Sequence, residues 1–190
     1  FAFVNTAFKN SSKYGISSKI NLALLKIRQQ LQRILEILDL LVIKVLMWGY
    51  PTKGRGKNID KILEPESFNQ TLRKLEAFRQ NENISNKEIE ALFSNGLRLS
   101  TVSKLLYFLK IKVDSFPSLI LDLRVIDALT RKDGFEDDEL KSLKKLNYNN
   151  APKKYTKYLE AMQSLASKMN VQPDKIEMFL FEFGSNLKEI

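Results

Sequence analysis

The chain has 190 residues and a mass of 22.0 kDa, and 44% of its residues are hydrophobic, which is enough to build a sizeable core. Lysine and arginine number 31 against 22 aspartates and glutamates, and the resulting net charge of +9 predicts polyanionic partners. The absence of cysteine and histidine excludes thiolate nucleophiles, Ser-His and Cys-His dyads, Cys/His zinc sites and the usual haem and iron–sulfur ligands. Any chemistry must therefore use carboxylates, lysine, hydroxyls or a hard cation held by carboxylates.

Residues 17–47 are predicted to form one long helix or two abutting ones, followed by a basic loop. Neither glycine nor proline occurs in residues 17–47, where apolar residues recur with a helical period. The most apolar part, residues 34–48, contains three charged residues, so it predicts a buried core helix rather than a membrane span. We expect the helix to stop near Gly49, before the glycine-spaced basic loop of residues 52–57.

Two further helices have ends that the sequence marks. The apolar period from Pro65 to Phe78 predicts a helix with proline in its first turn. Residues 85–88, Ser-Asn-Lys-Glu, form a capping box that opens a short helix through Phe93. Gly96 suits the left-handed cap that would end this helix.

The second half of the chain continues the helical pattern. Ser100 can cap one helix and Asp122 another, with a short extended piece at residues 118–121 between them. After an acidic stretch, helices are expected at about 154–169 and 175–187. Because alternation typical of strands nowhere persists, the fold class is all-α with about seven or eight helices.

The most specific local feature is a hairpin between two helices, residues 95–99, Asn-Gly-Leu-Arg-Leu. A tight hairpin that leads into a helix N-terminus presents free backbone amides and the positive end of a helix dipole, which suits a DNA phosphate. An ordinary helical hairpin with a capped second helix would have the same pattern. The residues expected to contact DNA here are Gly96, Arg98, Ser100, Thr101 and Ser103, with Lys104 close by.

An apolar run, residues 118–126, follows the second helix and carries one carboxylate, Asp122, at a helix start. A hairpin followed by a single aspartate in this position resembles the helix-hairpin-helix DNA glycosylases. Residues 48–51 (Trp-Gly-Tyr-Pro) with the basic loop, 99–108 and 176–181 further resemble the oxoguanine DNA glycosylase-like branch of small proteins. The resemblance covers roughly residues 40–184.

This resemblance implies a fold, a reaction and two catalytic residues. The fold would be a helix-hairpin-helix glycosylase-like helical unit over residues 1–190, or two lobes of about 1–80 and 81–190 that flank a DNA/base cleft. The reaction would excise a damaged or modified base, above all an oxidised purine, from duplex DNA by cleaving the N-glycosidic bond of a flipped nucleotide. Asp122 would stabilise positive charge at the sugar or activate a nucleophile, and Lys104 could be that nucleophile. The alternatives are that Asp122 only caps a helix and that Lys104 is a solvated surface lysine.

Two positions depart from the family pattern. Arg98 stands where the second hairpin glycine is usual, and its guanidinium could contact a phosphate directly. Counted from Gly96, the Schiff-base lysine of the bifunctional enzymes falls on Ser100, which cannot form an imine. Lys104 lies one helical turn later on the same face. From the sequence we therefore expect hydrolysis without a lyase step and no adduct trapped by borohydride.

Aromatic and basic residues outside the hairpin complete the predicted site. Trp48 and Tyr50 pair flat rings with a basic loop, as binders of flipped or single-stranded bases do, so we place them in the base pocket. A core tryptophan beside a flexible loop is the alternative. The remaining residues expected to bind DNA are Lys53, Arg55, Lys57 and Arg124.

The expected partner is double-stranded DNA with a flipped base. We expect the protein to be a monomer that does not bind a membrane. No metal or cofactor is expected, apart from a monovalent cation that the resemblance places on hairpin backbone carbonyls. The lack of cysteine fits a reducing compartment, and we expect a cytoplasmic, nucleoid-associated protein that begins internally rather than with a signal peptide. The rival functions are a non-catalytic helix-hairpin-helix module that grips DNA and a helical interaction protein whose charge is incidental.

Overall fold

The computed structural model describes residues 37–49, 58–130 and 137–184. The chain divides into two compact units, Phe1–Leu40 and Leu41–Ile190, and every contact discussed below lies within the second. The predicted helix before residue 37 and the basic loop with Tyr50, Lys53, Arg55 and Lys57 lie outside the described residues. The division into lobes at residue 80 stays a prediction.

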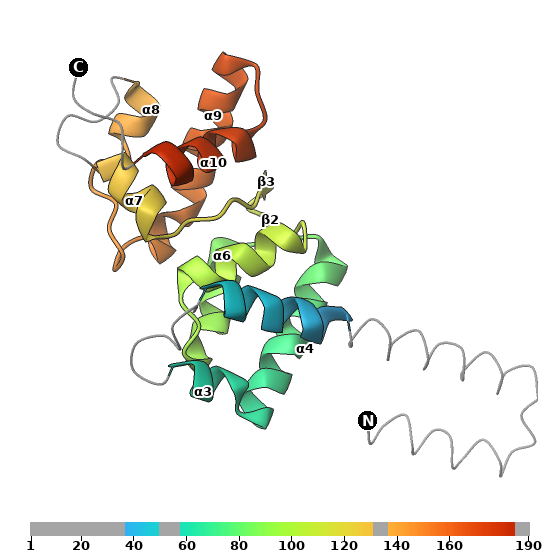
Figure 1. Ribbon diagram of the computed structural model, residues 1–190. Coiled ribbons are helices and arrows are strands. Elements are labelled where there is room, and N and C mark those ends of the chain that lie inside the picture. The colour runs from blue at the N-terminus through green and yellow to red at the C-terminus, as the bar shows by residue number, and fades with distance from the viewer. Residues whose placement is uncertain (1–36, 50–57, 131–136, 185–190) are drawn as a thin grey trace, which may run out of the picture. The chain divides into compact units, whose positions relative to one another are not determined.

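Most of the described residues are helical, which confirms the all-α fold class (Figure 1). Residues 41–49 are helical, as the apolar pattern before Gly49 predicted. The helices that follow are α3 (Asn58–Leu63), α4 (Pro65–Asn81), α5 (Asn86–Ile89), η1 (Glu90–Asn95, 3₁₀), α6 (Leu99–Phe108), α7 (Leu123–Thr130), α8 (Asp138–Lys141), η2 (Pro152–Lys154, 3₁₀), α9 (Tyr155–Met169) and α10 (Pro173–Phe183).

Three two-residue strands join the helices into one framework. β1 (Asn83–Ile84) pairs in parallel with β2 (Lys112–Val113), which pairs antiparallel with β3 (Phe116–Pro117). The turn between β2 and β3 uses Asp114 and Ser115, both with positive φ. Such short strands leave no alternation to detect in the sequence. β2 and β3 connect the end of α6 to the segment of residues 118–121, which leads to Asp122.

Several helix ends follow the local sequence signals. The Ser85 amide and hydroxyl both donate to the Glu88 carboxylate, at 2.7 and 2.8 Å, which confirms the capping box and lowers the pKa of Glu88. Beyond Ile89 the helix tightens into the 3₁₀ helix η1, and Gly96 ends it with φ of 84°. Local chemistry therefore sets this part of the hairpin.

Other helix ends differ from the expectation. Arg98, not Ser100, is the N-cap of α6, because buried Leu97 and Leu99 anchor the chain and the helix has already begun when it reaches Ser100. α10 begins at Pro173 rather than near residue 175. The acidic stretch itself starts a helix, α8, capped by the Asp137 side chain.

The extended segment of residues 118–121 runs through the core, and its polar groups are paired there. The hydroxyls of Tyr155 and Tyr158, both fully buried on α9, donate to the carbonyls of Leu119 at 2.6 Å and Ile120 at 3.0 Å. The Leu121 amide donates to Ser103 Oγ on α6 at 3.1 Å. Buried backbone groups need such partners, so these three side chains fix the backbone that ends at Asp122.

Gly184, at the end of α10, allows this helix to approach α7 (Figure 1). A Cβ at this position would collide with the Ala128 side chain on α7 and with the Leu180 carbonyl. We expect Gly184→Ala to lower the free energy of unfolding by about 1–3 kcal/mol, as overpacking does. Urea unfolding measures this change. Gly49→Ala is the matched control, because no atom lies within 4 Å of its added Cβ and alanine favours a helix. Equal effects at both positions would contradict the close contact.

Candidate functional site

Asp122 sits at the N-terminus of α7 and caps it. Its Oδ1 accepts from the Val125 amide at 3.2 Å, and its carbonyl accepts from the Ile126 amide at 3.0 Å. The side chain is half-buried, and its charge acts on both Lys104 and Glu177. The Asp122 carboxylate therefore caps α7 and still interacts electrostatically with Lys104 and Glu177.

Lys104 lies on α6 and is only 7% exposed, which rules out a solvated surface lysine. Its Nζ donates to Ser100 Oγ at 3.3 Å and lies 4.7 Å from the centre of the Trp48 ring. Burial lowers the pKa of Lys104, while the charges of Asp122 and Glu177 oppose this shift. A larger fraction of its amine is therefore uncharged at a given pH than for an ordinary lysine.

Glu177 on α10 completes the cluster, and the sequence analysis missed it as a site residue. It is 7% exposed, and burial, helped by the charges of Asp122 and Asp174, raises its pKa to about 7, while Lys104 acts in the opposite direction. The available signal was a carboxylate beside the buried apolar positions Ile176 and Leu180. Lys104, Asp122 and Glu177, which come from α6, the start of α7 and α10, thus form a cluster of groups that influence one another's charge.

Trp48 forms an exposed aromatic wall next to Lys104. It is 51% exposed, so it is not a core tryptophan. Its ring meets Phe108 edge-on at 6.2 Å, and Phe108 meets Tyr107 in the same manner at 5.4 Å. Flat, accessible rings beside a buried amine suit a planar ligand.

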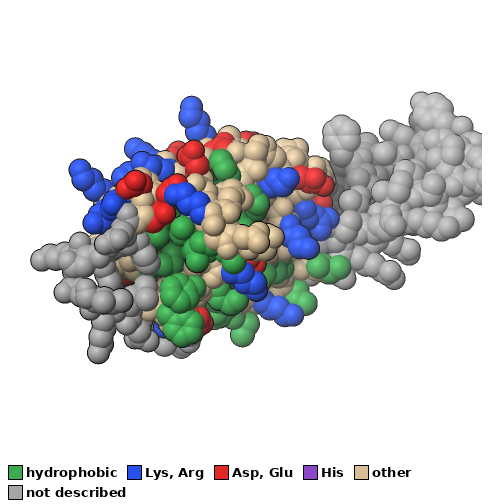
Figure 2. All heavy atoms as spheres, turned by 90° about the horizontal axis from the view of Figure 1, so that it is seen from above, with side chains coloured by type: hydrophobic (Ala, Val, Ile, Leu, Met, Phe, Trp, Pro, Cys, Tyr) green, Lys and Arg blue, Asp and Glu red, His purple; other side chains and the backbone are tan. Residues whose placement is uncertain are grey.

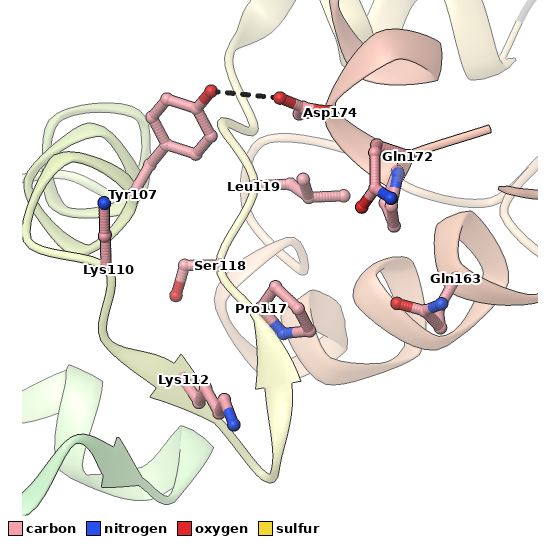
Figure 3. Close-up of a pocket in the computed structure, with 10 residues that line it drawn as sticks. Tyr107, Lys110, Lys112, Pro117, Ser118, Leu119, Gln163, Gln172 and Asp174 are labelled. Carbon is pink, nitrogen blue, oxygen red and sulfur yellow. Dashed lines mark hydrogen bonds between the residues drawn. The ribbon is translucent and has the colours of Figure 1, made fainter.

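A cavity of about 380 Å³ adjoins the cluster through Tyr107 (Figure 3). The Tyr107 hydroxyl donates to Asp174 Oδ2 at 3.5 Å, and Asp174 Oδ1 is buried without a hydrogen bond. Burial and the charges of Asp174 and Glu177 raise the pKa of Tyr107. Lys104 and Asp122 do not line this cavity, whose other walls include Pro117, Leu119, Gln163 and Gln172.

The residues expected to contact DNA separate into exposed and buried groups. Arg98 is exposed at the start of α6 and Ser100 is half-buried beside it. Thr101 and Ser103 are buried, so their side chains face the core. The Ser103 hydroxyl donates to the Ser100 carbonyl and accepts from the Leu121 amide. The guanidinium of exposed Arg124 lies 5.0 Å over the Phe181 ring.

Basic side chains lie at several places on the face shown in Figure 2, and acidic and hydrophobic side chains lie between these places. Within the described part of the chain, no group of three or more aspartates and glutamates could hold a metal ion. Among those same residues, no helix is long and apolar enough to cross a membrane.

One comparison with known proteins gives a match. The family described as "Putative 8-oxoguanine DNA glycosylase OGG-like protein" matches residues 24–181. The chain belongs to this family. Neither a curated protein nor a solved structure matches the chain significantly. The matched range of this OGG-like glycosylase family includes the hairpin, Lys104, Asp122 and Glu177, and membership implies DNA binding.

Arg98 is exposed, and it is one of the hairpin residues expected to contact DNA. We expect Arg98→Ala to weaken duplex binding and to reduce the slope of log affinity against log salt by about 0.9, the contribution of one phosphate. Fluorescence anisotropy of a labelled duplex at several salt concentrations measures both quantities. Arg73→Ala, an exposed arginine on α4, is the control and should change neither. If the slope is unchanged in Arg98→Ala, Arg98 does not contact a DNA phosphate and the hairpin is not the DNA interface.

Proposed function

We propose that this OGG-like protein excises a damaged or modified base, an oxidised purine above all, from duplex DNA. The observation that carries the proposal is that the buried Lys104 amine lies beside the exposed Trp48 ring and feels the charge of the half-buried Asp122 carboxylate. The protein would act as a monomer on a nucleotide flipped out of the duplex. The family match supports the class of reaction, and the cluster supports the two residues.

The reaction begins with the flipped base stacked on the exposed face of Trp48. As the C1′–N bond lengthens, its electron pair leaves with the base and positive charge builds at the sugar. The Asp122 carboxylate, held in place by the α7 amides, stabilises this charge. Because the carboxylate is fixed before the substrate arrives, it needs no reorganisation during the reaction.

Lys104 is the proposed nucleophile. Its uncharged amine donates a lone pair to C1′ as the base departs, and loss of a proton from nitrogen then allows the sugar ring to open to an imine. The sequence alone led us to expect no such adduct, because Ser100 occupies the family's lysine position. Because Lys104 is buried and its pKa is lowered, we propose instead that its amine forms the adduct.

The hairpin would hold the DNA backbone while the cluster acts on the base. Arg98 is exposed at the start of the helix that carries Lys104. Lys53, Arg55 and Lys57 remain proposed contacts from the loop after Trp48. Phosphate contacts of this kind position the duplex without reading its sequence.

Asp122→Asn should abolish excision while leaving the fold and DNA affinity nearly intact. Asparagine still caps α7, so the substitution removes the charge but keeps the structural role. Loss of one preorganised electrostatic group costs about 3–4 kcal/mol of transition-state stabilisation, or about 10²–10³ in rate. Single-turnover excision on duplexes that each carry one lesion measures the effect, with exposed Asp127→Asn as the control.

Two results would contradict this assignment. Excision that survives in Asp122→Asn would exclude the carboxylate mechanism. A wild-type protein that binds duplex DNA but excises no lesion would instead support the binding module, in which Asp122 only caps α7.

Borohydride should trap a covalent complex between Lys104 and a lesion-containing duplex, because an imine forms only on an amine. Lys104→Gln should lose the adduct, whereas Lys175→Gln, which changes an exposed lysine on α10, should keep it. Denaturing gel electrophoresis detects the adduct, and thermal unfolding confirms that each variant is folded. Excision by the wild type without any trapped adduct would point to water as the nucleophile.

A further inference from the structure

Ser100 lies one helical turn before Lys104 on α6, and a hydrogen bond joins their side chains. Lys104 Nζ donates to Ser100 Oγ at 3.3 Å. Residues four apart share one face of a helix, and long side chains in a helix point back toward its N-terminus. The Lys104 amine therefore lies over the turn that carries Ser100. The proposed reaction uses this amine but gives no task to the serine.

Two contacts from different elements define the position of the Lys104 amine. Ser100 Oγ accepts a hydrogen bond from it, and the centre of the Trp48 ring lies 4.7 Å from Nζ. Lysine carries its amine on a flexible four-carbon stem, so holding the amine in one place takes contacts of this kind. Lys104 is also 7% exposed, so its stem is enclosed by the protein. Of the two contacts, the hydrogen bond to Ser100 is the one that fixes a direction.

Hydrogen bonds connect the turn that carries Ser100 to the segment that ends at Asp122. The Ser100 carbonyl accepts from the Ser103 hydroxyl at 3.2 Å. The same hydroxyl accepts from the Leu121 amide at 3.1 Å, and Leu121 directly precedes Asp122. The residue that holds the amine is therefore itself held against the backbone that carries the Asp122 carboxylate.

The hydrogen bond to Ser100 also restricts the direction in which the Lys104 amine can react. A serine hydroxyl accepts an N–H from either an ammonium or an uncharged amine. An uncharged amine that donates one N–H to Ser100 Oγ has its lone pair directed away from this oxygen. The lone pair is then available for a bond to carbon, whereas an amine that rotates freely would spend most of its time in other orientations.

We propose that Ser100 is a positioning residue, whose hydroxyl holds the Lys104 amine in the orientation in which its nitrogen attacks C1′ of the flipped nucleotide. The role in the reaction rests on the proposed base excision, whereas the holding of the amine does not. Ser100 forms and breaks no covalent bond. It acts through Lys104, so its effect on the amine should be measurable in the protein without DNA.

Competitive acetylation of the full chain over a series of pH values, followed by peptide mass spectrometry, measures the reactivity of the Lys104 amine without DNA. Only the uncharged amine reacts. Ser100→Ala removes an acceptor that favours the ammonium, so the uncharged amine should appear at lower pH. We expect the labelling profile of Lys104 to move down by about 0.5–1 pH unit, the scale of one hydrogen bond to a charged group.

Excision and borohydride trapping show what the hydrogen bond does in the reaction. In single-turnover measurements with saturating duplex, Ser100→Ala should slow both by about 10–100-fold, because the amine is no longer held in line with C1′. The affinity for duplex should not change. A larger share of uncharged amine would by itself accelerate the attack. A slower reaction together with a labelling profile shifted to lower pH therefore indicates lost positioning rather than lost amine.

Two variants serve as controls. Ser100→Thr keeps a hydroxyl at the same position and should keep the labelling profile and the excision rate close to those of the wild type. Ser167→Ala removes an exposed hydroxyl on α9, which donates to the Gln163 carbonyl, and should change neither measurement. Thermal unfolding confirms that each variant is folded.

The two measurements separate the outcomes. An unchanged labelling profile in Ser100→Ala would overturn the proposal, and weaker duplex binding in the same variant would instead make Ser100 a DNA contact. A shifted profile with an unchanged rate of excision would also overturn it, because the position of the amine would then not matter to the reaction. If the profile shifts and the wild type excises no lesion, the holding of the amine stands and the proposed function fails.

Discussion

The pairing of backbone groups in the buried segment of residues 118–121 is the constraint on which the site depends. An extended segment in a helical core has no ladder of its own, so its buried carbonyls and amides need partners elsewhere, and three of them bond to side chains. Tyr155 and Tyr158 supply hydroxyls from α9, and Ser103 supplies one from α6. Together they fix the backbone immediately before Asp122. The Asp122 carboxylate is then held at the start of α7 by the Val125 amide. Loss of one partner would leave a buried polar group unpaired, at a cost of about 1–3 kcal/mol.

The cluster beside this segment contains two ionisable groups, Lys104 and Glu177, whose burial favours their uncharged forms. Lys104 and Glu177 lie almost wholly inside the protein, and replacing such groups by apolar residues often costs a protein nothing. Shifted ionisation of this kind is frequent where a protein performs chemistry. The lowered pKa of Lys104 and the raised pKa of Glu177 are shifts of this kind, and burial is the largest cause of both.

Local chemistry in the sequence predicted much of the fold. The Ser85 capping box, the Gly96 cap and Asp122 at the start of α7 depend on neighbouring residues, so they could be predicted from their spacing. The burial of Thr101, Ser103 and Lys104 could not, because it depends on packing against distant parts of the sequence, such as the segment before α7, where Ser103 bonds to Leu121. Glu177 was missed for the same reason, since a glutamate in a helix is ordinarily exposed.

The spacing on two helices explains how the cluster and the cavity are related. Lys104 and Tyr107 are three residues apart on α6, and Asp174 and Glu177 are three residues apart on α10, so each pair shares one helix face. Tyr107 donates a hydrogen bond to Asp174 (Figure 3). The charge of Glu177 also acts on Tyr107, so the residues of the cluster and those of the cavity influence one another electrostatically. The exposed ring of Trp48 also lies beside Lys104. The cluster therefore has an accessible aromatic ring next to its amine, and it is linked to the cavity through Tyr107 and Asp174, which line that cavity.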